Sequence, residues 1–356
     1  MKYKNNITIL FLSFFLMILL LSSCRSVDGD TKKRKEETNI ISVTTENKET
    51  YHIYAIEETP EQTLEDILTA LKKEKKDGKT EPVSKIFSTW IYDNKKTKES
   101  ITAFIRGKKE QIYSFSYQVS KKENILATRN QAIMYAWDLV SKKDCIEHTK
   151  SLEFLPLETA VQKTQSFLDT LGFHNVSLYR YSVINSDSLK QEGQKKVGKK
   201  DGYYYMVFTL QTDGISHFTT AENDYYRSDL VNKSATAPSI ECFYDSDGIF
   251  CITTQTGFFT IQSDLGTVST LSYEKALEKA NVSMYYMQES LILQESAHYQ
   301  WESAGIEYLP YRNLEKDVFQ LIPVWVFRGK KESDNTIEDA YILIHAETGE
   351  VLSESR

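Results

Sequence analysis

Residues 111–120 read QIYSFSYQVS, and this stretch decides the fold class. Its apolar positions are Tyr113, Phe115, Tyr117 and Val119, and they alternate with serines and a glutamine. Alternation with a period of two residues is typical of a β-strand with one buried and one solvated face. Antiparallel sheets commonly have this two-sided character. We therefore expect antiparallel sheet that packs on a core through one face.

Segments with a helical pattern precede the strand-like runs. The clearest of them begins after Ser272, a residue type that caps helix N-termini. Apolar residues then recur at positions i, i+3, i+4 and i+7, which lie on one helix face, and two earlier segments share this spacing. The three sets are Leu64, Ile67, Leu68 and Leu71; Leu157, Ala160, Val161 and Thr164; and Tyr273, Ala276, Leu277 and Ala280. We predict an α+β fold of repeated units, each a helix packed on an antiparallel sheet.

These units predict three folded domains, at residues 48–150, 151–265 and 266–356. Residues 24–47 precede them and are polar, charged and poor in aromatic residues, which is typical of a flexible tether. Residues 1–23 have a charged start and an apolar core, which is typical of a signal peptide.

The signal ends in Leu21-Ser22-Ser23-Cys24, which resembles the lipobox of bacterial lipoproteins. In that family the cysteine is acylated after cleavage, so the resemblance implies a lipid anchor at Cys24, carrying palmitate, and an extracytoplasmic location at the cell membrane. The alternative is an uncleaved membrane span. The apolar core at residues 7–21 is shorter than the ~20 residues that a spanning helix needs.

The charge balance excludes some partners. Removing Lys2 and Lys4 from a formal charge of −7 leaves −9 for the mature chain. Nucleic-acid binding requires clustered lysine and arginine, so we expect no nucleic-acid partner. An acidic chain is also repelled by anionic lipid, so contact with the membrane would depend on the lipid anchor.

The third unit resembles a known family. Residues 272–280 (SYEKALEKA), 321–327 (LIPVWVF) and 341–352 (YILIHAETGEVL) look like a PepSY-type module and are similar to the extracytoplasmic domains of YycH and YycI regulators. This resemblance implies a non-enzymatic α+β module that restrains a protease or modulates a membrane sensor. The sequence departs from the PepSY pattern at His345, where an aspartate is common, and in an inserted segment at residues 287–305.

No motif predicts catalysis, and we expect no enzyme activity, metal or cofactor. Cys145 and His148 have the only metal-like spacing, but a zinc site requires a second pair. Asp245 begins a pattern similar to a calcium loop, but Thr256 occupies the twelfth position, where a bidentate glutamate is needed. Asp245 and Asp247 are better explained as turn residues.

Three cysteines remain once Cys24 is lipidated, which permits one disulfide at most. Cys242 and Cys251 flank a turn and are the candidate pair. A four-residue loop would place Cys242 opposite Cys251, whereas a two-residue turn at Asp247-Gly248 would place it opposite Thr253. The alternative is two small, half-buried thiols.

The chain contains 22 tyrosines, several of them adjacent. Tyr225 and Tyr226 lie in a polar insertion and are the candidate contacts for a ligand or partner, because tyrosine offers a flat amphipathic surface. Tyrosine also suits strands with one wet face, and residues 203–210 fit that explanation.

Together these features predict a lipid-anchored, non-catalytic protein that binds or regulates a protein partner in the cell envelope, either a sensor or a protease. The alternative is a solute-binding lipoprotein that captures a peptide or a glycan. The sequence leaves any small-molecule ligand unidentified.

Overall fold

The computed structural model describes residues 42–43, 49–57, 64–84, 87–96, 99–108, 111–121, 151–191, 198, 200–219, 239–254, 259–290, 298–313, 318–333 and 336–354. The predicted signal peptide, Cys24, most of the tether, and Tyr225 and Tyr226 lie outside this part of the chain.

The elements are β1 (Ser42–Val43), β2 (Thr50–Glu57), α2 (Leu64–Glu74), β3 (Lys79–Ser84), β4 (Phe87–Asn94), β5 (Glu99–Lys108), β6 (Gln111–Lys121), α4 (Leu157–Thr170), β7 (Val176–Ile184), α5 (Ser186–Gln191), β8 (Tyr203–Thr212), β9 (Ile215–Ser216), β10 (Ser239–Asp245), β11 (Gly248–Thr254), β12 (Thr260–Ser269), α7 (Tyr273–Ser290), β13 (His298–Asn313), β14 (Val318–Ser333), β15 (Thr336–His345) and β16 (Val351–Glu354).

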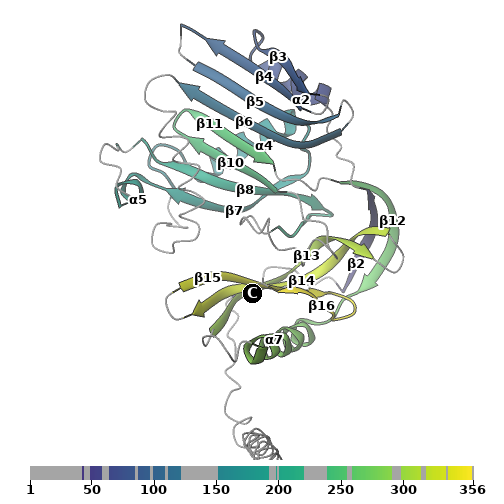
Figure 1. The fold of residues 1–356 in the computed structure, drawn as a ribbon. Helices are drawn as coiled ribbons and strands as arrows, with labels where there is room; N and C mark the ends of the chain where they lie inside the picture. The colour runs from purple at the N-terminus through teal and green to yellow at the C-terminus, as the bar shows by residue number, and fades with distance from the viewer. Residues whose placement is uncertain are drawn as a thin grey trace, which may run out of the picture. The chain divides into compact units, whose positions relative to one another are not determined.

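The described strands form two sheets (Figure 1). The nine-stranded sheet has the order β3-β4-β5-β6-β11-β10-β8-β7, with β9 paired to β8. The seven-stranded sheet has the order β1-β13-β14-β15-β16, and β2 joins it by pairing with β14 and β12. The strand pairs are antiparallel except for β1 with β13. The α+β prediction is therefore confirmed.

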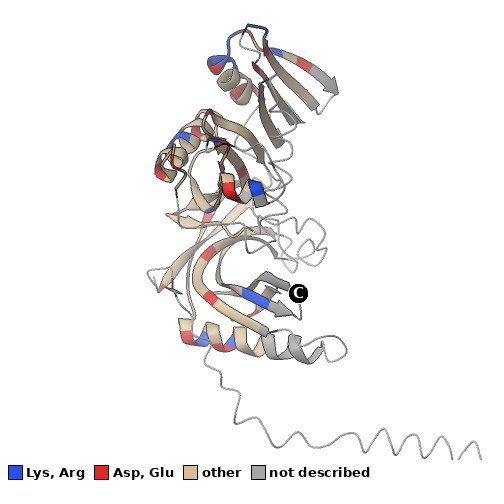
Figure 2. Ribbon diagram, turned by 90° about the vertical axis from the view of Figure 1, so that its left-hand side faces the viewer, with Lys and Arg blue, Asp and Glu red and all other residues tan. Residues whose placement is uncertain are grey.

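Each of three helices precedes a set of four strands that pair in chain order, although α5 and the short strand β9 interrupt the second set and β12 follows it. Helix α2 precedes β3 to β6, α4 precedes β7, β8, β10 and β11, and α7 precedes β13 to β16. The predicted apolar faces contain fully buried residues, such as Ile67 and Leu71 of α2 and Ala276 of α7, which are 0 % exposed. Helix α7 carries charged residues of both signs (Figure 2), and Glu274, Lys275, Glu278 and Lys279 are exposed.

The predicted domain boundaries stay predictions, but strand pairing crosses both of them. Strand β6 pairs with β11 and so joins the first and second predicted domains in one sheet. Strand β2 pairs with β12 and β14 and so brings N-terminal residues into the C-terminal sheet.

Two local predictions are wrong. The insertion expected at residues 287–305 is shared by two elements, because α7 extends to Ser290 and β13 begins at His298. Residues 203–209 of β8 do not alternate between buried and solvated positions, because β8 is an interior strand and these side chains are buried on both faces.

Among the described residues, no helix has both the length and the apolar character needed to span a membrane.

Candidate functional site

One short segment, residues 215–219, contacts both sheets. Its first two residues form β9 and pair with β8 of the nine-stranded sheet. Its next residue, His217, forms a parallel bridge with Tyr308 at the edge of β13. The N–H of Phe218 donates to the Tyr308 carbonyl oxygen at 2.8 Å. We call this segment, together with the side chains of both sheets that pack around it, the junction.

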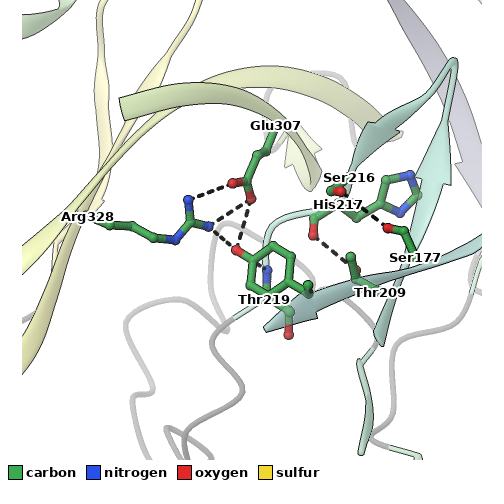
Figure 3. A network of polar contacts seen from close by, with 8 residues as sticks. Ser177, Thr209, Ser216, His217, Thr219, Glu307 and Arg328 are labelled. Carbon is green, nitrogen blue, oxygen red and sulfur yellow. Dashed lines mark hydrogen bonds and ion pairs between the residues drawn. The ribbon is translucent and has the colours of Figure 1, made fainter. Parts of the chain in front are cut away.

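Glu307 and Arg328 lie at the junction (Figure 3), and the hydroxyl of Tyr179 contacts both of them in one polar cluster. The guanidinium of Arg328 donates from Nη1 to Glu307 Oε1 at 2.6 Å and from Nη2 to Oε2 at 2.9 Å. The Tyr179 hydroxyl donates to Glu307 Oε2 at 3.0 Å and also contacts Arg328 Nη2. Because Tyr179 belongs to β7 and the ion pair to β13 and β14, this cluster joins the two sheets.

A β-bulge explains the position of Tyr179. On β7, Leu178 pairs with Phe208 and Arg180 pairs with Val207, which leaves Tyr179 without an opposite residue. Such an extra residue bends the strand and redirects its side chain. The bulge thus frees Tyr179 to reach the other sheet.

Aromatic rings enclose the cation. The Arg328 guanidinium carbon lies 5.1 Å from the ring centroid of Tyr179 and 5.5 Å from that of Phe218. The side chain of Glu307 is 13 % exposed and that of Arg328 is 33 % exposed. Burial raises the pKa of Glu307 and lowers the pKa of Arg328. The bidentate contact opposes both shifts, because each charge stabilises the other.

His217 occupies the opposite face of β13. Its partner Tyr308 and the adjacent Glu307 point to opposite faces, since side chains alternate along a strand. The imidazole is stacked on Phe259 at 5.3 Å between centroids and meets the edge of Tyr308 at 6.3 Å. His217 is 1 % exposed, and this burial lowers its pKa to about 3.

The imidazole has one hydrogen bond among the described residues. Its Nε2 lies 2.9 Å from Thr212 Oγ1, whereas Nδ1 has no partner there. The His217 carbonyl oxygen accepts a hydrogen bond from Thr209 Oγ1 at 3.0 Å. His217 is therefore fixed to the nine-stranded sheet through its main chain and its ring.

Strand β2 supplies a further contact between the sheets. The Tyr54 hydroxyl donates to Asp213, which lies in the β8–β9 turn at a φ of 54°. The Tyr308 hydroxyl donates to the His52 carbonyl oxygen at 3.1 Å. His52 Nδ1 lies 2.9 Å from Asp264 of β12.

This arrangement is suited to holding two sheets together. The carboxylate of Glu307 is engaged by Arg328 and Tyr179, and the rings of Phe218 and His217 pack on opposite faces of one sheet edge. In the described part of the chain, no group of three or more His, Cys, Asp or Glu side chains is placed to hold a metal ion.

The cysteine prediction is wrong in its geometry. A bulge after Phe243 sets the register so that Cys242 faces Ile252 and Cys251 faces Phe243, and neither expected pairing occurs. The two thiols consequently point to opposite faces of the sheet, and both are free. Burial raises the pKa of each, and that of Cys251 reaches about 12.

The remaining candidate residues lie either in a turn or outside the described residues. Asp245 accepts a hydrogen bond from the N–H of Asp247 at 2.8 Å, which confirms their role in the turn. Cys24, Tyr225 and Tyr226 lie outside the described residues and stay predictions. The sequence reasoning missed Tyr179, His217, Glu307 and Arg328. The available signal was a charged residue, Glu307 or Arg328, at an inward position of an apolar strand.

The comparisons with known proteins give a likeness of fold. No family model and no curated protein matches the sequence. The structure is similar to the crystal structure of an uncharacterized protein from Eubacterium rectale ATCC 33656, with 13 % identity, a TM-score of 0.56, and coverage of 86 % of this chain and 87 % of the other. It also matches the Bacillus megaterium YpeB C-terminal domain with 12 % identity, a TM-score of 0.36, and coverage of 83 % and 98 %. The first of these shows a shared overall fold.

Proposed function

We propose that this chain is a lipid-anchored, non-catalytic protein on the extracytoplasmic side of the cell membrane, where it binds a protein partner such as a sensor or a protease. The signal-like start and Leu21-Ser22-Ser23-Cys24 support the location. The resemblance of residues 272–352 to PepSY and YycI modules supports a regulatory role rather than an enzymatic one.

The observation that carries the binding proposal is the exposure of β12. Among the described strands, β12 pairs with β2 alone, so one of its edges faces away from the sheet. Residues 261–267 are exposed, including Ile261 at 39 % and Leu265 at 51 %. The free edge of a strand can pair with an extended segment of another protein, and the side chains then give specificity.

Two bulges in β12 limit what can pair with it. The register shifts between Ile261 and Ser263, and again between Asp264 and Thr267, where Gly266 has a φ of 101°. Bulges of this kind interrupt the ladder and protect an edge strand against indiscriminate aggregation. The strand therefore favours a short partner segment that recognises Ile261 and Leu265.

We further propose that the three runs of one helix and four strands are related PepSY-like or YycI-like units. The common element order and the pairing of each set of four strands in chain order support this proposal. Superposition of the three runs provides the test. Helices that cross their sheets in different directions would contradict a common origin.

Photo-crosslinking in intact cells tests the binding proposal. A photoreactive amino acid replaces Gln262 or Leu265 in β12, and the matched control replaces Val282, which is 48 % exposed on α7. We expect one discrete protein adduct from the β12 positions and none from the control. Equal adducts from all three positions, or none from β12, would contradict the proposal.

Two further measurements separate the parts of the proposal. Cys24→Ala should abolish the incorporation of labelled palmitate and leave protein that is either uncleaved or released from the membrane fraction. Incorporation that persists in this variant would contradict the anchor. A peptide or cell-wall glycan that raises the melting temperature, in the absence of a β12 adduct, would instead favour the solute-binding alternative.

A further inference from the structure

The junction encloses an imidazole whose protonation is energetically unfavourable. His217 is 1 % exposed and lies between the rings of Phe259 and Tyr308. A neutral imidazole has one N–H donor and one acceptor nitrogen, so its N–H can sit on Nε2 and donate to Thr212 Oγ1 at 2.9 Å while Nδ1 stays unprotonated. A protonated imidazole donates from both nitrogens, and Nδ1 has no acceptor among the described residues. Protonation would therefore bury a charged donor without a partner, which is costly.

The charged groups nearby are committed elsewhere. On β13, Glu307 is held by Arg328 of β14 on the face opposite to Tyr308. In the β8–β9 turn, Asp213 accepts from Tyr54 of β2. Other titratable groups on the packed elements include Tyr51, His52 and Glu57 of β2, Asp264 of β12, and Glu302 and Tyr308 of β13, and His52 pairs with Asp264. None of these carboxylates has a contact with His217 in the described part of the chain, so none compensates its charge.

The position of His217 connects its protonation to the junction. The same residue hydrogen-bonds to β8 through its main chain and bridges to β13. Releasing the imidazole to water requires residues 215–219 to leave the edge of β13. We propose that His217 makes the junction between the two sheets acid-labile, so that a fall in pH opens it. This inference goes beyond the proposed partner binding and does not depend on it.

The direction and size of the effect follow from linkage. Burial holds the pKa of His217 at about 3 in the closed junction, against an ordinary value of 6.5. The open state therefore binds the proton more tightly, and closure is fully favoured above pH ~6.5 and weakens as the pH falls toward ~3. The opening equilibrium should rise about tenfold per pH unit in this window, or about 30-fold between pH 7.5 and pH 5.0.

Hydrogen exchange measures this opening. The N–H of Phe218 donates to Tyr308 across the junction and reports on it directly. The full chain in detergent is compared with His217→Gln and with His217→Phe, which keeps an aromatic ring against Phe259. Comparing variants at one pH cancels the intrinsic pH dependence of exchange. We expect protection at Phe218 to fall about 30-fold from pH 7.5 to pH 5.0 in the native protein relative to either variant.

Two controls make the result specific. His174→Gln alters a histidine whose side chain is 54 % exposed and pairs with Asp169, away from the junction, and should leave the acid response intact. The N–H of Val326, within the paired strands β14 and β15, should stay protected at pH 5.0. The proposal is overturned by equal protection in native and variant proteins at both pH values. It is also overturned by a parallel loss at Val326, which would indicate global unfolding.

Discussion

Removal of either partner of the Glu307–Arg328 pair should destabilise the protein unequally. Arg328→Met leaves a carboxylate that is 13 % exposed and retains the hydroxyl of Tyr179 as a donor. An uncompensated buried charge costs about 3–5 kcal/mol, and we expect about 3 kcal/mol here because methionine keeps part of the packing against Phe218. Glu307→Gln leaves a guanidinium with a third of its side chain exposed, so water replaces part of the lost contact. We expect a cost of about 2 kcal/mol for this change.

The double variant distinguishes an ion pair from two independent contacts. With both charges removed, no buried charge is left without a partner, and we expect a total cost of about 3 kcal/mol rather than the sum of about 5 kcal/mol. Urea unfolding measures these values, with the fluorescence of the buried Trp301 and Trp325 as the signal. Single costs that add to within about 0.5 kcal/mol would refute the coupling, and a larger cost for Glu307→Gln would refute the argument from exposure.

Three further changes test packing, thiol burial and turn geometry. Gly329→Ala places a Cβ 1.9 Å from a main-chain oxygen of β13 and should lower the free energy of unfolding by about 2–3 kcal/mol in urea. In the control Gly198→Ala, the nearest atom lies 3.5 Å from the new Cβ, so stability should change by less than about 0.5 kcal/mol. Equal costs for the two variants would contradict the close packing at Gly329. Cys242 and Cys251 should resist alkylation in the native protein at pH 8, because burial raises the pKa of both thiols, and should react after unfolding; rapid native labelling would contradict their burial. His345 Nδ1 accepts hydrogen bonds from two turn N–H groups at 3.3 and 3.4 Å. In the same unfolding assay, His345→Asp should keep most of the stability because a carboxylate also accepts hydrogen bonds, whereas His345→Leu should lose about 1 kcal/mol. Equal losses in the two variants would exclude the acceptor role.

Local periodicity predicted the elements whose burial it reflects. The alternation at residues 111–120 corresponds to β6, and the helical spacing at Ala276 and Ala280 corresponds to the buried face of α7. Strand β12 was missed because it is exposed along most of its length, so no apolar alternation marks it. Strand β8 is buried on both faces, so the alternation in its sequence led to the wrong prediction of one solvated face. Periodicity reports one-sided burial and fails where a strand is exposed or covered on both sides.

The junction could not be predicted from local sequence. Tyr179 and Glu307 are 128 residues apart and meet only because a bulge in β7 redirects the tyrosine. Arg328 and Tyr179 are 149 residues apart. Nothing in either segment specifies its partner, and the bulge depends on register rather than on composition. The cysteine register failed for the same reason, because one extra residue shifts every later pair.

The pairing of β2 within the C-terminal sheet has a consequence for the order of folding. The carbonyl of His52 receives its hydrogen bond from Tyr308, which follows 256 residues later. At a synthesis rate of ~5–20 residues per second, the early strand waits roughly 13–50 s for its partners to be made. During that interval its main-chain groups and its tyrosines are free to pair wrongly. Strand β2 is therefore protected from incorrect pairing only after the last strands have been made. A chain cut short before β14 would leave β2 without the neighbour that buries it.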